Sequence, residues 1–195
     1  MLLRSVFAIL LCTGVSVGSF IRPVCAAECE GVRVAETLEI GGEKLVLNGL
    51  GLREATVFKI NVYVAALYLK APNTDGDAVA NADEAKLIRL SFLRDVTKSD
   101  MRKTITDGFK SSSADEWPAL EERAQKFFEL LPAFEQGQTL TLWYSPGKGV
   151  QVKAPGKGSG TIEGFDFARA LFKVWLGEHP PSAAIKRGLL GGRCG

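Results

Sequence analysis

Residues 56–70 form a stretch rich in Val, Ile, Tyr and Phe, TVFKINVYVAALYLK, which contains neither proline nor glycine. β-Branched and aromatic residues favour extended structure, so this stretch predicts one long strand. By the two-residue period of a strand, Lys59, Asn61 and Tyr63 share one face. The opposite face is apolar and carries Phe58, Ile60, Val62, Val64 and Ala66. We therefore expect this strand to line a cleft that has a polar end.

The segments on both sides of this stretch also have the alternating pattern of strands. Residues 33–47 alternate polar and apolar around Gly41-Gly42, which predicts a hairpin that is broken at the glycine-rich residues 48–51. Residues 73–77 have the composition of a loop, and residues 86–96 predict a further strand. Three β segments before any helix favour an antiparallel sheet over a βαβ repeat.

Helical periodicity dominates the second half of the chain. Ser99 is suited to cap a helix that has Met101, Ile105 and Phe109 on one face. Pro132 stops a second, more regularly patterned helix over residues 117–131. Further predicted elements are strands at 139–144, 149–153 and near 161–162, and helices at 168–176 and 180–190. The whole pattern predicts an α+β fold, in which helices cover one face of a curved antiparallel sheet.

The N-terminus has the pattern of a secretory signal peptide. Arg4 gives a positive start, residues 5–21 are uncharged and mostly apolar, and Val24-Cys25-Ala26 places small residues at a cleavage site. The alternative is an uncleaved membrane anchor, since the apolar run is almost long enough to span a bilayer. We expect a signal peptide at residues 1–26, cleavage after Ala26 and a single mature domain at residues 27–195. The protein would then be periplasmic or secreted, without stable membrane insertion.

Cleavage would change both the charge and the cysteine count. Arg4 and Arg22 leave with the signal, so 24 basic residues fall to 22, the same number as the acidic residues. A neutral chain without a basic stripe gives no support for nucleic-acid binding. Cys29 and Cys194 remain at opposite ends of the mature chain. In an oxidising compartment they either form a disulfide or stay as two free thiols, and the sequence leaves both open.

The residue types needed for catalysis or metal binding are sparse. His179 is the only histidine, it falls in a predicted turn between two helices, and no nucleophile elbow accompanies it. One histidine and two dispersed cysteines do not match a zinc site of familiar spacing. Residues 156–160, GKGSG, resemble a phosphate loop but lack the eight-residue Walker pattern, so hairpin glycines explain them better. We expect no metal and no cofactor.

Arg53 is the residue best suited to bind a ligand. It follows Gly49-Leu50-Gly51, and glycines allow a backbone to come close to a ligand. An arginine fork suits a carboxylate or an enolate-like oxygen, and the hydroxyl of Tyr63 could add one donor. The alternative is that Arg53 forms a surface ion pair with Glu54 or another acid.

The order and spacing of four segments resemble the chalcone isomerase superfamily, and most closely its bacterial, exported chalcone isomerase-like members. The segments are residues 49–53 (GLGLR), 62–69 (VYVAALYL), 170–177 (ALFKVWLG) and 181–191. The resemblance extends from about residue 33 to residue 191. It implies an open-faced sandwich, a large antiparallel sheet covered on one face by helices, which agrees with the pattern of predicted elements.

The superfamily contains isomerases that close a chalcone to a flavanone and non-catalytic relatives that bind fatty acids. The isomerases' arginine falls on Arg53 and a threonine of their long strand falls on Tyr63. A tyrosine and an asparagine of their first helix become Met101 and Gly108, and a late Thr or Ser becomes Val174. Each lost donor would remove about 2.7–4 kcal/mol of transition-state stabilisation. The resemblance therefore implies no efficient chalcone isomerase, whereas Arg53 with Tyr63 resembles the carboxylate-binding arrangement of the fatty-acid-binding relatives.

Three functions remain open. The first is an exported, non-catalytic protein that binds a fatty acid or a similar apolar carboxylate, with Arg53 as anchor and Tyr63 as a second donor. The second is an isomerase or intramolecular lyase of unknown substrate, with Arg53 as the electrostatic catalyst. The third is an interaction protein of the cell envelope. A cavity beside Arg53 would separate the third function from the first two.

Overall fold

The computed structural model describes residues 26–55, 60–156 and 158–194. Nearly all of the predicted signal peptide, residues 1–26, therefore lies outside the described residues. So do Phe58 and Lys59, which were assigned to opposite faces of the predicted strand. Within the described ranges, no helix is both long enough and apolar enough to cross a membrane.

The centre of the fold is a curled antiparallel sheet in which each strand pairs with the next along the chain. This arrangement confirms the predicted antiparallel sheet, and it needs only hairpins and helical connections between neighbouring strands. The strands are β3 (Thr37–Ile40), β4 (Glu43–Ala55), β5 (Ile60–Leu69), β6 (Lys86–Phe92), β7 (Thr139–Ser145), β8 (Gly149–Ala154) and β9 (Gly158–Ile162).

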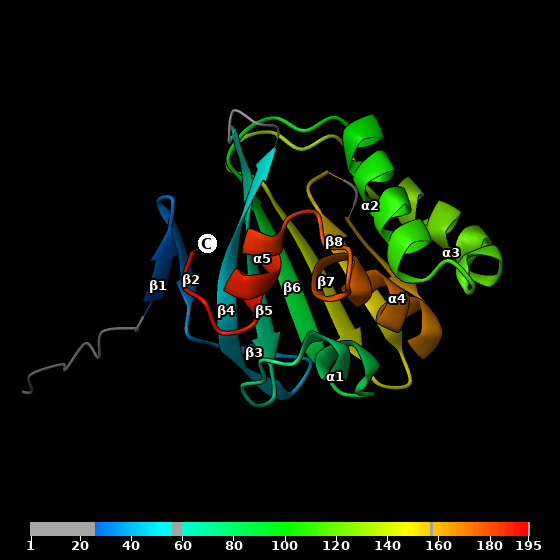
Figure 1. Ribbon diagram of the computed structural model, residues 1–195, viewed down its shortest axis with the longest axis horizontal. Helices are drawn as coiled ribbons and strands as arrows, with labels where there is room; N and C mark the ends of the chain where they lie inside the picture. Colours follow the sequence, from blue (N-terminus) through cyan, green and yellow to red (C-terminus); the bar gives the residue numbers. More distant parts are fainter. Residues whose placement is uncertain (1–25, 56–59, 157, 195) are drawn as a thin grey trace, which may run out of the picture.

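Helices lie over one face of this sheet, which confirms the predicted α+β architecture (Figure 1). Each of them turns an apolar stripe toward the sheet; Ile105, Phe127 and Leu171, from three different helices, are all buried. Pro118 starts the second of these helices and Gly177 ends the third. The covering helices are α2 (Lys98–Ser112), α3 (Trp117–Leu130), α4 (Phe165–Leu176) and α5 (Ala183–Leu189).

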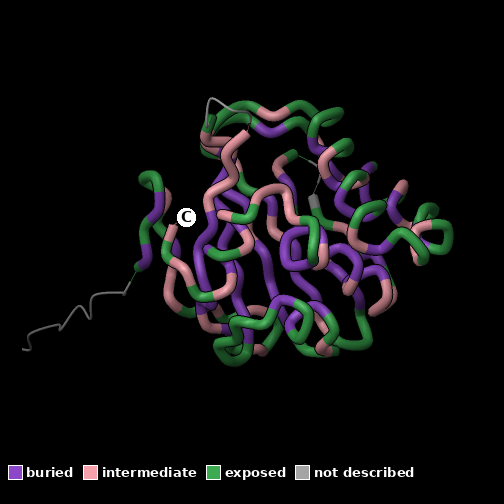
Figure 2. The backbone as a smooth tube through the Cα atoms, in the orientation of Figure 1, coloured by how far each residue is buried: buried purple, intermediate pink, exposed green. Residues whose placement is uncertain are grey.

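Most of β5 is buried (Figure 2), and its two faces belong to different apolar clusters. Tyr63 and Leu67 belong to the large apolar cluster between the sheet and the helices. Val64 and Tyr68 belong to a second cluster on the opposite face. A separate hairpin made of β1 (Ala26–Cys29) and β2 (Val32–Ala35) contributes Ala27, Cys29 and Val34 to this second cluster. The prediction of one polar face for this strand was wrong, since Tyr63 is only 3% exposed.

The predicted break at residues 48–51 was also wrong. β4 continues through it to Ala55, with an irregularity in register between Leu47 and Gly49. A bulge of this kind lets a strand absorb an extra residue without ending. The predicted hairpin over residues 33–47 is divided, because β2 pairs with β1 and only β3 pairs with β4 around Gly41-Gly42. As a result, Arg53 lies within a strand and not in an approach to one.

The glycines before Arg53 approach a helix and not a ligand. A Cβ atom on Gly49 would lie 2.1 Å from the carbonyl oxygen of Gly188, and one on Gly51 would lie 2.4 Å from that of Ile185. A Cβ atom on Gly188 would in turn lie 2.3 Å from the carbonyl oxygen of Leu50. β4 and α5 therefore pack backbone to backbone, and glycine is the only residue that fits at these positions. This corrects the expectation of a glycine-rich ligand approach.

One helix was missed and one cap was misplaced. α1 (Gly76–Asn81) begins inside the predicted loop, where the Asp75 side chain accepts hydrogen bonds from the backbone N–H groups of Asp77 and Ala78. The helix is too short for a periodic pattern, so this cap is its main signal. α2 is capped by Thr97, which accepts from the N–H of Asp100, and the predicted cap Ser99 lies in the first turn.

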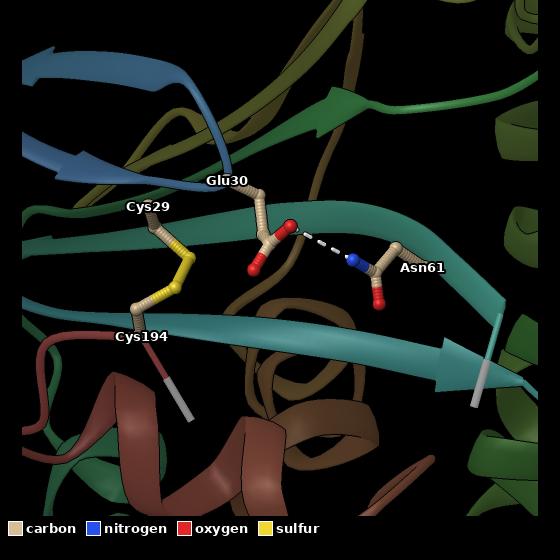
Figure 3. The surroundings of a disulfide bond; sticks show 4 residues. All are labelled: Cys29, Glu30, Asn61 and Cys194. Carbon is tan, nitrogen blue, oxygen red and sulfur yellow. Dashed lines mark hydrogen bonds between the residues drawn. A yellow bond between two sulfur atoms is a disulfide. The ribbon is translucent and has the colours of Figure 1, made fainter.

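A disulfide joins Cys29 to Cys194 and ties the two ends of the described chain together (Figure 3). The C-terminal residues lie along β4, where the N–H of Cys194 donates to the carbonyl of Leu50 at 2.9 Å. At the tip of the β1–β2 hairpin, the Asn61 amide donates to the Glu30 carboxylate at 2.9 Å. We call the β1–β2 hairpin, the disulfide and residues 191–194 the clamp.

Candidate functional site

Arg53 and Tyr63 face each other across two neighbouring strands. They are paired residues in the register of β4 and β5. Side chains of directly opposed residues in an antiparallel pair share one face, with Cβ atoms about 4.5–5.5 Å apart. Two residues that are ten positions apart in sequence therefore form one local group. This is the arrangement that an arginine anchor with a tyrosine as second donor requires.

Tyr63 is buried and its hydroxyl oxygen is already an acceptor. The indole Nε1 of Trp175, on α4, donates to this oxygen at 3.1 Å. Burial raises the pKa of the Tyr63 hydroxyl, while the hydrogen bond from Trp175 and the positive charge of Arg53 act in the opposite direction. The hydroxyl thus keeps its proton at neutral pH. Because the indole can only donate, the proton of Tyr63 stays available for another acceptor.

A pocket of about 230 Å³ opens beside this pair. It lies where the ends of β4 and β5 meet the loop before α2 and the first turns of α2. Apolar and charged side chains both line it, so it is more polar than the predicted apolar cleft. The lining residues are Arg53, Ala55, Val62, Tyr63, Arg94, Asp95, Val96, Asp100, Met101 and Thr104.

The two carboxylates at this pocket have local structural partners. Asp95 accepts from the backbone N–H of Gln136 at 2.9 Å, and Asp100 accepts from the hydroxyl of Thr97 at 2.8 Å. Among the described residues, neither of them forms an ion pair with Arg53, and Glu54 does not either. The alternative of a surface ion pair for Arg53 therefore finds no support in the described part of the chain.

The three positions that lack the isomerases' donors are used for packing. Met101 and Val174 are buried in the core. A Cβ atom on Gly108 would lie 2.6 Å from Cγ1 of Val174, so α2 and α4 are in contact at this point. Helices approach this closely only where one side chain is minimal. The chain has no side-chain hydrogen-bond donor at any of these positions and no space between Gly108 and Val174.

His179 lies in the turn between α4 and α5, as predicted, and lines a second pocket of about 390 Å³, which Arg53 also lines. Thr104 lines both pockets. The glycines at 156–160 belong to the β8–β9 hairpin, with Gly156 at φ +67°, which agrees with the hairpin interpretation. In the described ranges, no group of three or more His, Cys, Asp or Glu residues is placed to hold a metal ion.

Sequence reasoning missed two residues of the site. Trp175 was noted only as part of a helical stripe, because its partner Tyr63 lies 112 positions away in sequence. Arg94 follows the end of β6 and was not singled out. Neither carries a local signal, since the tertiary fold brings Trp175 to Tyr63 and Arg94 to the pocket.

The model of the chalcone isomerase-like family matches residues 26–191. The chain belongs to this chalcone isomerase-like family, which confirms the resemblance found in the sequence. The fold is shared with the crystal structure of a fatty-acid binding protein from Arabidopsis thaliana. The two superpose with a TM-score of 0.66 at 18% identity, over 84% of this chain and 95% of that chain. No curated protein matches the sequence.

Proposed function

We propose that this protein binds an apolar carboxylic acid of the fatty-acid class and does not convert it. The observation that carries the proposal is the pairing of Arg53 and Tyr63 at the wall of a pocket. Arg53 supplies a charged fork, and Tyr63 supplies an O–H donor whose oxygen is held by Trp175. Hydrogen bonds between ionised partners are shorter and stronger than neutral ones, so a carboxylate is the group that this pair recognises best.

The apolar part of the ligand has a surface to bind beside the carboxylate. Val62, Val96 and Met101 line the same pocket as Arg53. Binding pockets commonly combine apolar walls with a few polar groups that fix the ligand's orientation. The fold shared with a fatty-acid binding protein supports the same ligand class.

The absence of turnover follows from the residues on the helices. An isomerase needs donors aimed at the charge that develops in the transition state. At the matching positions this chain has Met101, Gly108 and Val174, and the last two are packed against each other. We expect that a chalcone incubated with the protein shows no Arg53-dependent loss of its absorbance. Such a loss would favour the isomerase alternative.

We further propose that the protein is exported and acts in the periplasm or outside the cell. The signal pattern at residues 1–26 supports this, and so does the disulfide between Cys29 and Cys194, because structural disulfides persist in oxidising compartments. Mass spectrometry of the protein recovered from cells tests both points. We expect a chain that begins at Ala27, with a two-dalton deficit for the disulfide.

Native mass spectrometry and calorimetry of the mature protein test the binding function. We expect a co-purifying or added fatty acid to bind one to one, and Arg53→Gln to weaken binding roughly 10- to 100-fold through the loss of one charged hydrogen-bonding partner. Arg33→Gln is the matched control, since Arg33 forms an exposed ion pair with Glu28 on the β1–β2 hairpin. Equal affinity of the Arg53 variant would overturn the anchor. A protein that ignores every added acid would point to the envelope interaction role.

A further inference from the structure

We infer that the site takes short-chain or single-ring carboxylic acids, and that Met101 sets this size limit. The inference rests on the proposed function and narrows its ligand class. It is carried by the size of the pocket beside Arg53 and by the packing at its inner end.

The pocket that Arg53 shares with Tyr63 and Met101 holds only a small acid. Its volume of about 230 Å³ is below the ~300–1,000 Å³ of sites for drug-sized ligands. At about 30 Å³ for each water-sized group, there is room for roughly eight such groups. A carboxylate and a chain of about six carbons fill this space, and so does a carboxylate on one ring. A longer chain must leave the pocket or displace the side chains behind it.

In the described part of the chain, buried side chains separate the pocket from the core. Met101 lines the pocket and is 3% exposed, and one turn further along α2 Ile105 is fully buried. On the strand side, the hydrogen bond between Tyr63 and Trp175 joins β5 to α4. Protein interiors are close-packed, so a chain cannot enter between these elements without opening a space first. Met101 is the residue of this barrier that both touches the pocket and carries no polar role.

The chain length of the bound acid is therefore the quantity to measure. We would titrate the mature protein with straight-chain acids from butanoate to hexadecanoate by calorimetry. Each methylene that enters an apolar site is worth about fourfold in affinity. We expect affinity to rise by about this factor up to six to eight carbons and then to stay level, because further methylenes remain in water.

Two variants test the residue assignment. Met101→Ala removes the inner wall, so we expect the length of best binding to increase while short acids still bind through Arg53. Leu120→Ala is the matched control, because Leu120 is buried on α3 and does not line the pocket. In this control, the dependence of affinity on the chain length of the acid should be the same as in the wild type. Circular dichroism and thermal unfolding verify that each variant is folded before titration.

The outcomes separate this inference from the function on which it rests. A wild-type affinity that keeps rising about fourfold per methylene through dodecanoate would overturn the size limit and leave the Arg53 anchor standing. An unchanged length dependence in folded Met101→Ala would overturn the role of Met101. If no acid of any length binds, the proposed function itself is wrong.

Discussion

The two faces of β5 carry two buried tyrosines with opposite roles. On the clamp side, Tyr68 donates its hydroxyl proton to the carbonyl of Ala35 at 2.9 Å. On the helix side, the Tyr63 hydroxyl accepts from Trp175, and Tyr63 lines the pocket. The first hydroxyl donates its only proton within the fold. The second hydroxyl has no acceptor among the described residues, and Tyr63 lines a cavity that Arg53 also lines.

The comparison gives a physical criterion for separating structural polar groups from functional ones. In the clamp, the cysteines are bonded to each other and Arg193 forms a bidentate contact with Glu36. These groups are matched inside the molecule, so they contribute to stability. At the pocket, we propose that a ligand completes the arrangement of Arg53 and Tyr63. Changes in the clamp should therefore alter stability, and changes at the pocket should alter binding.

The largest effect is expected from opening the clamp. The disulfide spans a sequence separation of 165 residues, so its loss frees a long loop in the unfolded chain and costs about 5 kcal/mol of unfolding free energy. We predict this loss for the double variant Cys29→Ala/Cys194→Ala in urea unfolding. Binding of hexanoate to the folded fraction should be unchanged, and a loss of binding would show that the two regions are coupled.

The next effect concerns a buried cation that is used within the fold. The ammonium group of Lys86 donates to the carbonyls of Val79, Ala80 and Ala82. Burial lowers the pKa of Lys86 to about 8, below the 10.5 of an exposed lysine. Between pH 8 and 10 the unfolded chain holds more protons than the folded one, so stability rises with pH.

The gain in unfolding free energy from Lys86 amounts to at most about 1.4 kcal/mol for each pH unit. The pH dependence fades as the pH falls below 8, because Lys86 then becomes protonated in the folded state as well. Urea unfolding at pH 8, 9 and 10 measures it, and Lys86→Met should remove it. A wild type and a Lys86→Met variant with the same pH dependence would contradict this account.

The smallest effect, and the sharpest test of the comparison, is a pair of tyrosine variants. Tyr68→Phe should lose about 1 kcal/mol of stability with its hydrogen bond to Ala35, while its binding of hexanoate stays unchanged. Tyr63→Phe should weaken binding by roughly three- to tenfold, since it removes one donor to the carboxylate. Urea unfolding and calorimetry measure the two quantities. Equal binding losses in both variants would remove the distinction between the two faces.

Elements with a long local pattern could be predicted from the sequence. The apolar stretch at 60–69 is a strand because its residue types favour extension over many positions. The stripe through Leu120, Ala124 and Phe128 is a helix for the corresponding reason. The sequence did not predict α1, because six residues are too few to show a helical period. The sequence also did not predict that β4 is continuous, because its glycines have the composition of a turn. These glycines are required by the close packing of α5.

The site could be predicted only in part. Arg53 and Tyr63 were found through residue chemistry and family resemblance, and the register of β4 and β5 brings them together. The glycines before Arg53 were assigned to a ligand, although they serve the contact with α5. Trp175 and Arg94 could not be assigned from local sequence, because each contributes through contacts with distant segments. The size of the pocket likewise depends on side chains from several elements.

The most direct test of the Arg53–Tyr63 site compares two ligands of the same length on the same protein. The mature protein is titrated by calorimetry with hexanoate and, separately, with hexanol. The two ligands differ only in the group that would face Arg53. A charged hydrogen-bonding partner is worth about 1.5–3 kcal/mol, so we predict that hexanoate binds roughly 10- to 100-fold more tightly. Equal affinities for the acid and the alcohol would contradict a carboxylate site at Arg53 and Tyr63.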